Sequence, residues 1–250
     1  MKNFLILCFV FSFSAPVLAE IESTVWEYVD ARQEKKEFKR WSLSNWFYQK
    51  ETMRLQDQWL LLNLDDGFIF TEFYTDYSNT TFDQNTQTED DLENPGIASE
   101  TGLYLAFLGF TYRYEKYDDL YFQKEGALNL RLIGSSHQAT HLILTYGNRY
   151  FADDSLGDFD QKFYGGDISL YLTSFLGFDG RYRIYNETKT GLENHKISGT
   201  RTQWGVFVDL SFLRLFATQF EEDIELKGLD GVSDDERQVK GTSFGARIYI

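Results

Sequence analysis

The sequence is short of three residue types, and each shortage narrows what the chain can be. It has one cysteine, two prolines and three histidines in 250 residues. Because the one cysteine is Cys8, we expect neither a disulfide within the chain nor a metal site built from cysteine. Proline cannot donate a hydrogen bond to a strand ladder, so its scarcity is compatible with a chain made mostly of paired strands.

Positive charge is also scarce. Lysine and arginine number 24 against 39 aspartates and glutamates, which gives a net charge of −15. A chain with this net negative charge does not neutralise the phosphates of a nucleic acid, so we expect no nucleic-acid partner. Many acidic residues fall in expected loops: Glu89, Asp90, Asp91, Asp153, Asp154, Asp158, Asp160, Asp234, Asp235 and Glu236. We interpret them as solvated loop tips and not as calcium sites, because none has the regular ligand spacing of a calcium loop. No metal and no cofactor is predicted.

Long apolar runs are absent as well. No segment reaches the roughly 20 continuous apolar residues that a membrane-spanning helix requires. Residues 1–19 instead have the pattern of an export signal, with Lys2 at the positive start, an apolar stretch at 4–13 and a small-residue cleavage site that ends at Ala19. The sequence therefore predicts export through the inner membrane.

The last residues alternate strictly between two kinds of side chain. One face carries Lys240, Thr242, Phe244, Ala246, Ile248 and Ile250, and the other carries Gly241, Ser243, Gly245 and Arg247. A strand that is apolar on one face and small or polar on the other is typical of the closing strand of an outer-membrane β-barrel.

The same two-residue period recurs upstream and predicts about ten strands, with eight or twelve as alternatives. Their expected ranges are 68–77, 97–106, 109–116, 125–134, 140–149, 162–173, 177–187, 200–210, 212–222 and 238–250. Three similar hairpins, which begin at Leu103, Leu170 and Val208, turn tightly through apolar residues. Because outer-membrane barrels have short periplasmic turns, we place these turns in the periplasm and expect long outer loops at 78–96, 117–124, 150–161, 188–199 and 223–237.

The face of these strands opposite the apolar residues is rich in charge. It carries the predicted lumen network: Glu100, Arg113, Glu115, Arg131, Asp167, Asp179, Arg181, Arg183, Arg201, Asp209, Arg214 and Arg247. Arginine and carboxylate groups in a narrow lumen pair with bidentate geometry and fill it, so we interpret this set as a structural polar core. A selective channel lining is the alternative.

Two groups of residues are candidate catalytic sites. Ser135, Ser136, His137 and His141 combine candidate nucleophiles and bases, but they fall in a predicted periplasmic turn. His195, beside Glu193 and Asn194, falls in an outer loop without an Asp-x-His pair. We assign no catalytic residue and interpret both groups as ordinary turn and loop residues.

Residues 42–62 have a helical period, with Trp46, Met53 and Leu60 on one stripe and Tyr48, Leu55 and Leu62 on the next. An apolar arc this broad must be covered. We expect the helix to dock through Trp46, Met53 and Leu60 at the periplasmic mouth of the barrel or on the membrane, with a periplasmic partner as the alternative.

From the strand pattern, the hairpins and the signal, the chain resembles the small monomeric outer-membrane β-barrels of Gram-negative bacteria over residues 68–250. The resemblance implies a transmembrane antiparallel β-barrel at 63–250, preceded by a signal at 1–19 and a periplasmic segment at 20–62. It also implies a monomer in contact with outer-membrane lipid, lipopolysaccharide and the barrel-insertion machinery. The leading hypothesis is a non-enzymatic barrel, structural or surface-binding, with a side-chain-filled lumen. The alternatives are a narrow pore for small solutes and an outer-membrane hydrolase acting on lipid or peptide.

Overall fold

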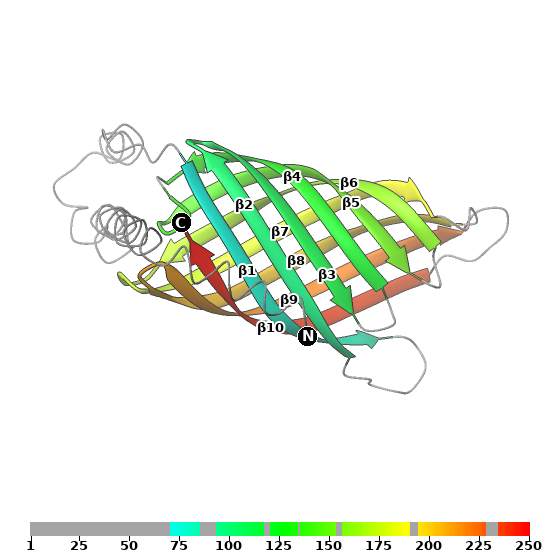
Figure 1. Cartoon of the computed structure of the whole chain (residues 1–250). Helices are drawn as coiled ribbons and strands as arrows, with labels where there is room; N and C mark the ends of the chain where they lie inside the picture. Colours follow the sequence, from blue (N-terminus) through cyan, green and yellow to red (C-terminus); the bar gives the residue numbers. More distant parts are fainter. Residues whose placement is uncertain are drawn as a thin grey trace, which may run out of the picture. The chain divides into compact units, whose positions relative to one another are not determined.

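A computed structural model describes residues 71–85, 94–117, 121–134, 136–153, 157–190, 195–228 and 235–250 of the chain (Figure 1). The predicted export signal, the helix predicted at 42–62 and its docking residues Trp46, Met53 and Leu60 lie outside these residues. Among the described residues, no helix is long and apolar enough to cross a membrane.

The described part forms a closed antiparallel β-barrel of ten strands, each inclined to the barrel axis (Figure 1). The strands are β1 (Thr71–Asn85), β2 (Asn94–Leu105), β3 (Leu108–Tyr117), β4 (Tyr121–Ile133), β5 (His141–Asp153), β6 (Gly157–Tyr171), β7 (Leu176–Lys189), β8 (His195–Leu210), β9 (Leu213–Gly228) and β10 (Asp235–Tyr249). Each strand pairs with the next one along the chain, and β1 pairs with β10. The predicted fold class, an antiparallel barrel of about ten strands, is confirmed.

The first and last strands close the barrel along their whole shared length. Their register runs from Tyr74 opposite Tyr249 to Asn85 opposite Gln238. Beyond the last strand residue, Phe73 and Ile250 exchange two backbone hydrogen bonds, with N to O distances of 3.1 and 2.8 Å. The ladder therefore has no open edge at this seam, as a barrel in a bilayer requires.

Two of the tight hairpin turns depend on a residue in the left-handed backbone region. Ala106 begins the link between β2 and β3 with φ of 56°, and Ser211 begins the link between β8 and β9 with φ of 58°. Alanine and serine have small side chains, which limits the clash that this conformation causes. In the link between β6 and β7, the Thr173 hydroxyl accepts hydrogen bonds from the amides of Phe175 and Leu176. These short links all lie at the same end of the barrel as the last residues of β10, which we call the turn end.

The strands are longer than the sequence predicted, and the predicted outer loops are correspondingly shorter. β1 continues to Asn85 and β9 to Gly228, so much of the loops expected at 78–96 and 223–237 is strand. Asp158 and Asp160, interpreted as loop-tip residues, lie in β6. The reason for the error is that the outward face changes from apolar to polar toward this end, which removes the alternation although the ladder continues.

The outer wall is apolar and the interior is polar, the reverse of a water-soluble protein. Large apolar side chains face outward on every strand. Examples are Leu128 on β4, Leu144 on β5 and Phe244 on β10, and Leu128 and Phe244 are each 66% exposed. Toward the far end, the outward side chains include a ring of aromatic residues: Tyr77, Tyr112, Tyr146, Tyr164, Tyr182, Trp204 and Phe244. This is the architecture of small outer-membrane β-barrels.

Candidate functional site: the barrel lumen

All twelve residues of the predicted lumen network face the barrel interior. Glu100, Glu115, Arg131, Arg183, Arg201, Asp209 and Arg214 are buried, and Arg113, Asp167, Asp179, Arg181 and Arg247 are half-buried. The structure adds inward polar residues that the sequence analysis left out, among them Glu72, Asp76, Gln123, Gln161 and Glu222. Glu72, Tyr74 and Asp76 lie on one face of β1 at a period of two residues, and this period could have identified Glu72 and Asp76 as inward.

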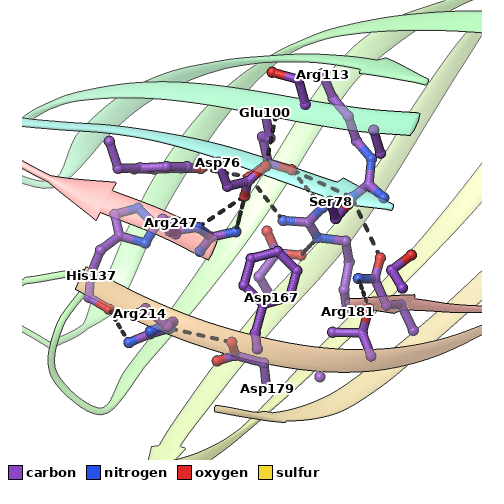
Figure 2. Close-up of a pocket in the computed structure, with 18 of the residues that line it drawn as sticks. Asp76, Ser78, Glu100, Arg113, His137, Asp167, Asp179, Arg181, Arg214 and Arg247 are labelled. Carbon is purple, nitrogen blue, oxygen red and sulfur yellow. Dashed lines mark hydrogen bonds and ion pairs between the residues drawn. The ribbon is translucent and has the colours of Figure 1, made fainter. Parts of the chain in front are cut away.

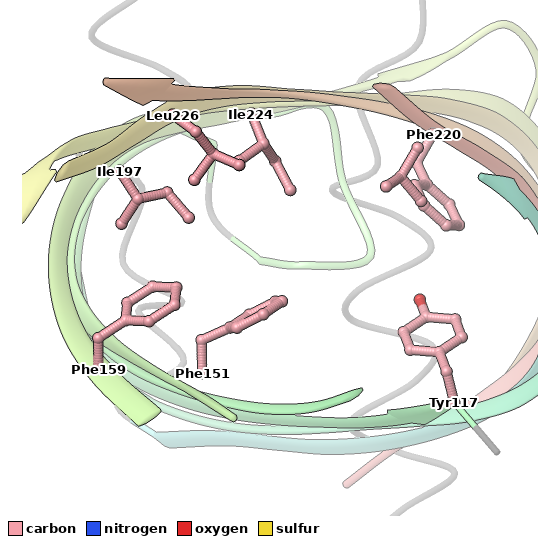
Figure 3. Packing of buried hydrophobic residues seen from close by; sticks show 8 residues of the cluster. Tyr117, Phe151, Phe159, Ile197, Phe220, Ile224 and Leu226 are labelled. Carbon is pink, nitrogen blue, oxygen red and sulfur yellow. The ribbon is translucent and has the colours of Figure 1, made fainter. Parts of the chain in front are cut away.

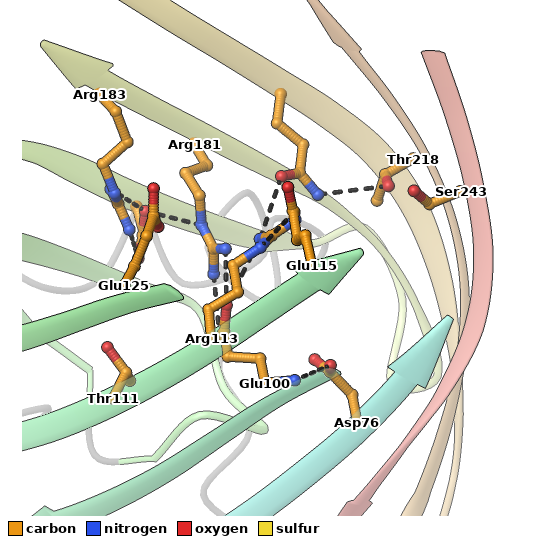
Figure 4. A network of polar contacts seen from close by, with 12 residues as sticks. Asp76, Glu100, Thr111, Arg113, Glu115, Glu125, Arg181, Arg183, Thr218 and Ser243 are labelled. Carbon is orange, nitrogen blue, oxygen red and sulfur yellow. Dashed lines mark hydrogen bonds and ion pairs between the residues drawn. The ribbon is translucent and has the colours of Figure 1, made fainter. Parts of the chain in front are cut away.

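Two bidentate ion pairs cross the full width of the lumen, and Figure 4 shows the one between Arg181 and Glu100. The Arg181 guanidinium on β7 donates to both carboxylate oxygens of Glu100 on β2, at 2.7 and 3.1 Å. Arg201 on β8 donates to both oxygens of Glu115 on β3, at 2.9 and 3.0 Å. In the strand order around the ring, β2 lies opposite β7 and β3 lies opposite β8. Each pair therefore joins diametrically opposed walls.

Further arginines join these two pairs into one network. Arg113 contacts Glu115 and also donates to Glu100 at 3.5 Å and to the Gln203 side chain at 3.4 Å. Asp167 accepts from Arg181 at 3.2 Å and from Arg183 at 2.7 Å. Because each carboxylate is shared, no ion pair can open without disturbing its neighbours.

Arg149 and Glu222 extend the network beside the Arg201–Glu115 pair, because Glu222 also accepts from Arg201 at 3.4 Å. Arg149 pairs with Glu222, donates to the Gln161 side chain at 2.7 Å and stacks 3.6 Å from the centre of the Tyr185 ring. The Tyr185 hydroxyl in turn donates to Glu125 at 2.8 Å. Both residues of the Arg149–Glu222 pair are almost fully buried. The hydrogen bonds and the aromatic face around this buried ion pair stabilise it.

An apolar layer lines the lumen at its loop end (Figure 3). It consists of Tyr117, Phe151, Phe159, Ile197, Phe220, Ile224, Leu226 and Val239, all buried. Phe151 and Phe159 stack with ring centres 5.2 Å apart. These side chains point inward from six strands.

At the turn end, the link between β4 and β5 folds into the lumen. Residues 136–141 are all buried. The His137 amide donates to Glu72 at 3.3 Å, its carbonyl accepts from Arg214 at 3.3 Å, and the Gln138 side chain donates to the Ser211 carbonyl at 2.6 Å. The His137 ring lies 4.2 Å from that of Tyr104. The sequence predicted a turn here but not its inward course.

Backbone geometry explains the inward course. The register between β4 and β5 shifts between Arg131 and Ile133, and Gly134 follows with φ of 97°. A β-carbon at Gly134 would lie 2.4 Å from the Thr140 carbonyl oxygen, so the two ends of the link approach too closely for any other residue. The bulge and this glycine direct the chain into the barrel.

Between the inward turn and the crossing ion pairs, a cavity of about 60 Å³ remains (Figure 2). Four arginines and four carboxylates line it: Arg113, Arg181, Arg214, Arg247, Asp76, Glu100, Asp167 and Asp179. The volume holds a few water molecules, since one water needs roughly 10–15 Å³ by this measure. The formal charges of these eight side chains balance.

The candidate catalytic residues do not assemble into an active site among the described residues. The Ser136 hydroxyl accepts from the Gln138 amide, and His141 Nδ1 lies 2.9 Å from the Ala139 carbonyl. His141, Ser169 and Asp179 are register partners on adjacent strands, but the serine lies between the other two, whereas a triad needs the histidine in the middle. His195 begins β8. No group of three or more potential metal ligands occurs within the described ranges.

No protein-family model and no curated protein matches the sequence. Solved structures with a similar chain path include Neisserial surface protein A, at 11% identity, a TM-score of 0.35, 70% of this chain and 96% of that chain. They also include the outer membrane protein OprG from Pseudomonas aeruginosa, at 11% identity, a TM-score of 0.27, 72% of this chain and 95% of that chain. Ail, the attachment invasion locus protein of Yersinia pestis, matches at 8% identity, with a TM-score of 0.25, 72% of this chain and 97% of that chain. Likenesses of this size carry no inference about function.

Proposed function

We propose that the chain is a non-enzymatic barrel of the Gram-negative outer membrane whose closed lumen forms a rigid scaffold and whose outer end binds partners. The observation that carries the proposal is that two ion pairs cross the lumen, Arg181–Glu100 and Arg201–Glu115. A solute that crosses the lumen must separate these paired charges. Breaking a buried pair by loss of one partner costs about 3–5 kcal/mol, which is a steep barrier to passive flow.

The outer wall supports this location. Its apolar band, with aromatic side chains at the upper edge, suits a bilayer. The predicted export signal and the short links at one end support a barrel in the outer membrane with its turn end in the periplasm. Lipid and lipopolysaccharide would surround the wall, and the barrel-insertion machinery would place the chain there as a monomer.

Three groups of inward residues along the lumen support a closed lumen over the narrow-pore alternative. The inward turn around His137 occupies one end, the charged network the middle and the apolar layer the other end. For the hydrolase alternative, the described residues contain no hydroxyl, histidine and carboxylate arranged as a catalytic set. What is left for function is the outer end of the barrel and its loops.

Planar-bilayer recording tests the closed lumen. We expect the purified full chain to insert from detergent and remain electrically silent at high protein load. Heat-modifiable gel migration, which reports a folded barrel, is the positive control for insertion-competent protein. Stable single-channel steps from the folded protein would instead establish the narrow pore.

A further inference from the structure

Three lysines on the outer wall form an arc over β3, β4 and β6. They are Lys116, Lys124 and Lys162, and all three are exposed. Each alternates with buried, inward residues of its own strand, so each points away from the lumen. We call this set the lysine arc.

The register of the barrel places the lysine arc at one height. Residues that pair across strands form rows that climb around a tilted barrel. The row that starts at Leu108, the first residue of β3, reaches Glu221 in the middle of β9. With a tilt near 40°, a row climbs about 3 Å per strand, and one residue along a strand adds about 2.5 Å of height.

The climb from strand to strand and the offset along each strand nearly cancel between the three lysines. Lys124 pairs with Tyr114, two residues below Lys116 on β3. Lys162 pairs with Asn148, whose partner Gly126 lies two residues below Lys124. The heights of the three lysines therefore agree within about 2 Å, although they lie on three strands.

The lysine arc lies just above the aromatic ring of the outer wall. Tyr164 is two residues below Lys162 on β6, and Tyr112 is four residues below Lys116 on β3. The lysines are thus about 5–10 Å above exposed tyrosines. Because such tyrosines sit at the boundary between hydrocarbon and headgroups, the three ammonium groups lie at the level of lipid phosphates.

In the described part of the chain, the lysines of the arc have no carboxylate partner, whereas Lys196, Lys227 and Lys240 each have one. Lys196 pairs with Glu187 at 2.7 Å and Lys240 with Glu221 at 3.0 Å. Within the residues that the structure describes, no ion pair involves Lys116, Lys124 or Lys162. The carboxylates nearest above them on β6 are engaged elsewhere: Asp160 accepts from Asn148 at 3.1 Å and Asp158 from Tyr150 at 2.8 Å.

We propose that the lysine arc binds the phosphate groups of lipopolysaccharide in the outer leaflet. The proposal rests on the outer-membrane location and the orientation proposed above. Lysine binds phosphate as a point charge, and each exposed lysine at a membrane surface adds attraction to anionic lipid. Lys116 and Lys124 are diagonal neighbours, with β-carbons roughly 7–8 Å apart. Lys162 lies about 12 Å from Lys124, which leaves room for a second, separate phosphate group.

The test compares two triple variants of the full chain in detergent. The arc variant is Lys116→Gln, Lys124→Gln and Lys162→Gln, and the matched control is Lys196→Gln, Lys227→Gln and Lys240→Gln. Both remove three positive charges from the outer wall. The probe is purified lipopolysaccharide that carries its lipid phosphates, or the same material after the phosphates have been removed. We expect the arc variant to lose about tenfold or more in affinity and the control to stay within about twofold of the unaltered chain.

Removal of the phosphates from the probe should weaken binding to the unaltered chain as much as the arc variant does. Equal losses in the two variants, or a probe that binds equally well without phosphates, would overturn the proposal. Equal competition by phosphatidylglycerol vesicles would also overturn it, because it would indicate a general attraction to anionic lipid. Heat-modifiable migration verifies that both variants fold. The result is independent of conductance, so it can fail while the closed-lumen proposal stands.

Discussion

At the scale of single residues, arginine dominates the interior because its planar guanidinium can join two walls at once. Arg201 reaches Glu115 on the opposite side of the barrel and also Glu222 at 3.4 Å on the neighbouring strand. Lysine would supply the charge but not the fork of parallel donors. The aromatic faces beside the guanidinium groups, such as Phe207 at 3.7 Å from Arg214, replace water that these groups have lost.

His137 lies in the inward turn, outside the membrane-spanning strands, and should make the barrel sensitive to acid. Burial, followed by the nearby positive charges of His141 and Arg131, lowers the pKa of His137 well below its ordinary value of 6.5. The unfolded chain therefore takes up this proton first as the pH falls. The contribution of His137 is fully present above about pH 6.5 and is lost progressively below it.

We expect the thermal unfolding temperature in detergent to fall between about pH 7.5 and pH 5, and to fall less in His137→Gln. The comparison isolates this residue because every other titrating group is common to both proteins. The same slope in the two proteins would mean that His137 is not held neutral by burial.

At the scale of elements, the inward turn between β4 and β5 is the feature that most distinguishes this barrel from a plain hairpin array. Its course depends on Gly134, where φ is 97° and a β-carbon would lie 2.4 Å from the Thr140 carbonyl oxygen. We predict that Gly134→Ala lowers the free energy of unfolding by about 1–3 kcal/mol or more.

Gly126→Ala is the matched control for this substitution. A β-carbon at Gly126 meets nothing within 4 Å, so the free energy of unfolding should change by no more than about 0.5 kcal/mol. Denaturant unfolding of both variants in the same detergent measures the difference. A Gly134→Ala protein as stable as Gly126→Ala would show that the turn does not need this conformation.

Sequence periodicity was enough to predict about ten strands and, on most of them, which face is apolar. It could not give the strand ends, because beyond the apolar band both faces are polar, as with Thr81 and Thr242 outside and Thr80 and Ser243 inside. Nor could it show the inward turn, since Ser136, His137 and Gln138 are residues that suit an exposed turn equally well. Their burial depends on partners distant in sequence, such as Glu72 and Ser211.

At the scale of the whole molecule, the twelve residues proposed for the lumen are brought together from eight strands by barrel closure alone. The alternation placed them on one face but could not show which of them contact each other. Arg181 and Glu100 are 81 residues apart in sequence, and Arg201 and Glu115 are 86 apart. Only the order of the strands around the barrel places the two strands of each pair opposite each other. That order is a property of the closed sheet.

The lumen is closed, on this account, because two carboxylates hold arginines from the far wall. Glu100→Ser with Glu115→Ser removes both acceptors on the far wall and leaves Arg181 with Asp167 and Arg201 with Glu222 in a wider space. Glu221→Ser with Glu225→Ser removes two carboxylates from the outer wall and serves as the matched control. If the first variant folds poorly, Glu100→Gln with Arg181→Gln cuts one crossing pair without changing the net charge.

The most direct measurement is single-channel recording of these folded variants beside the unaltered chain. The account predicts silence from the unaltered chain and the control, and discrete conductance steps from the variant that lacks Glu100 and Glu115. A folded variant that stays silent would contradict the claim that these ion pairs close the lumen.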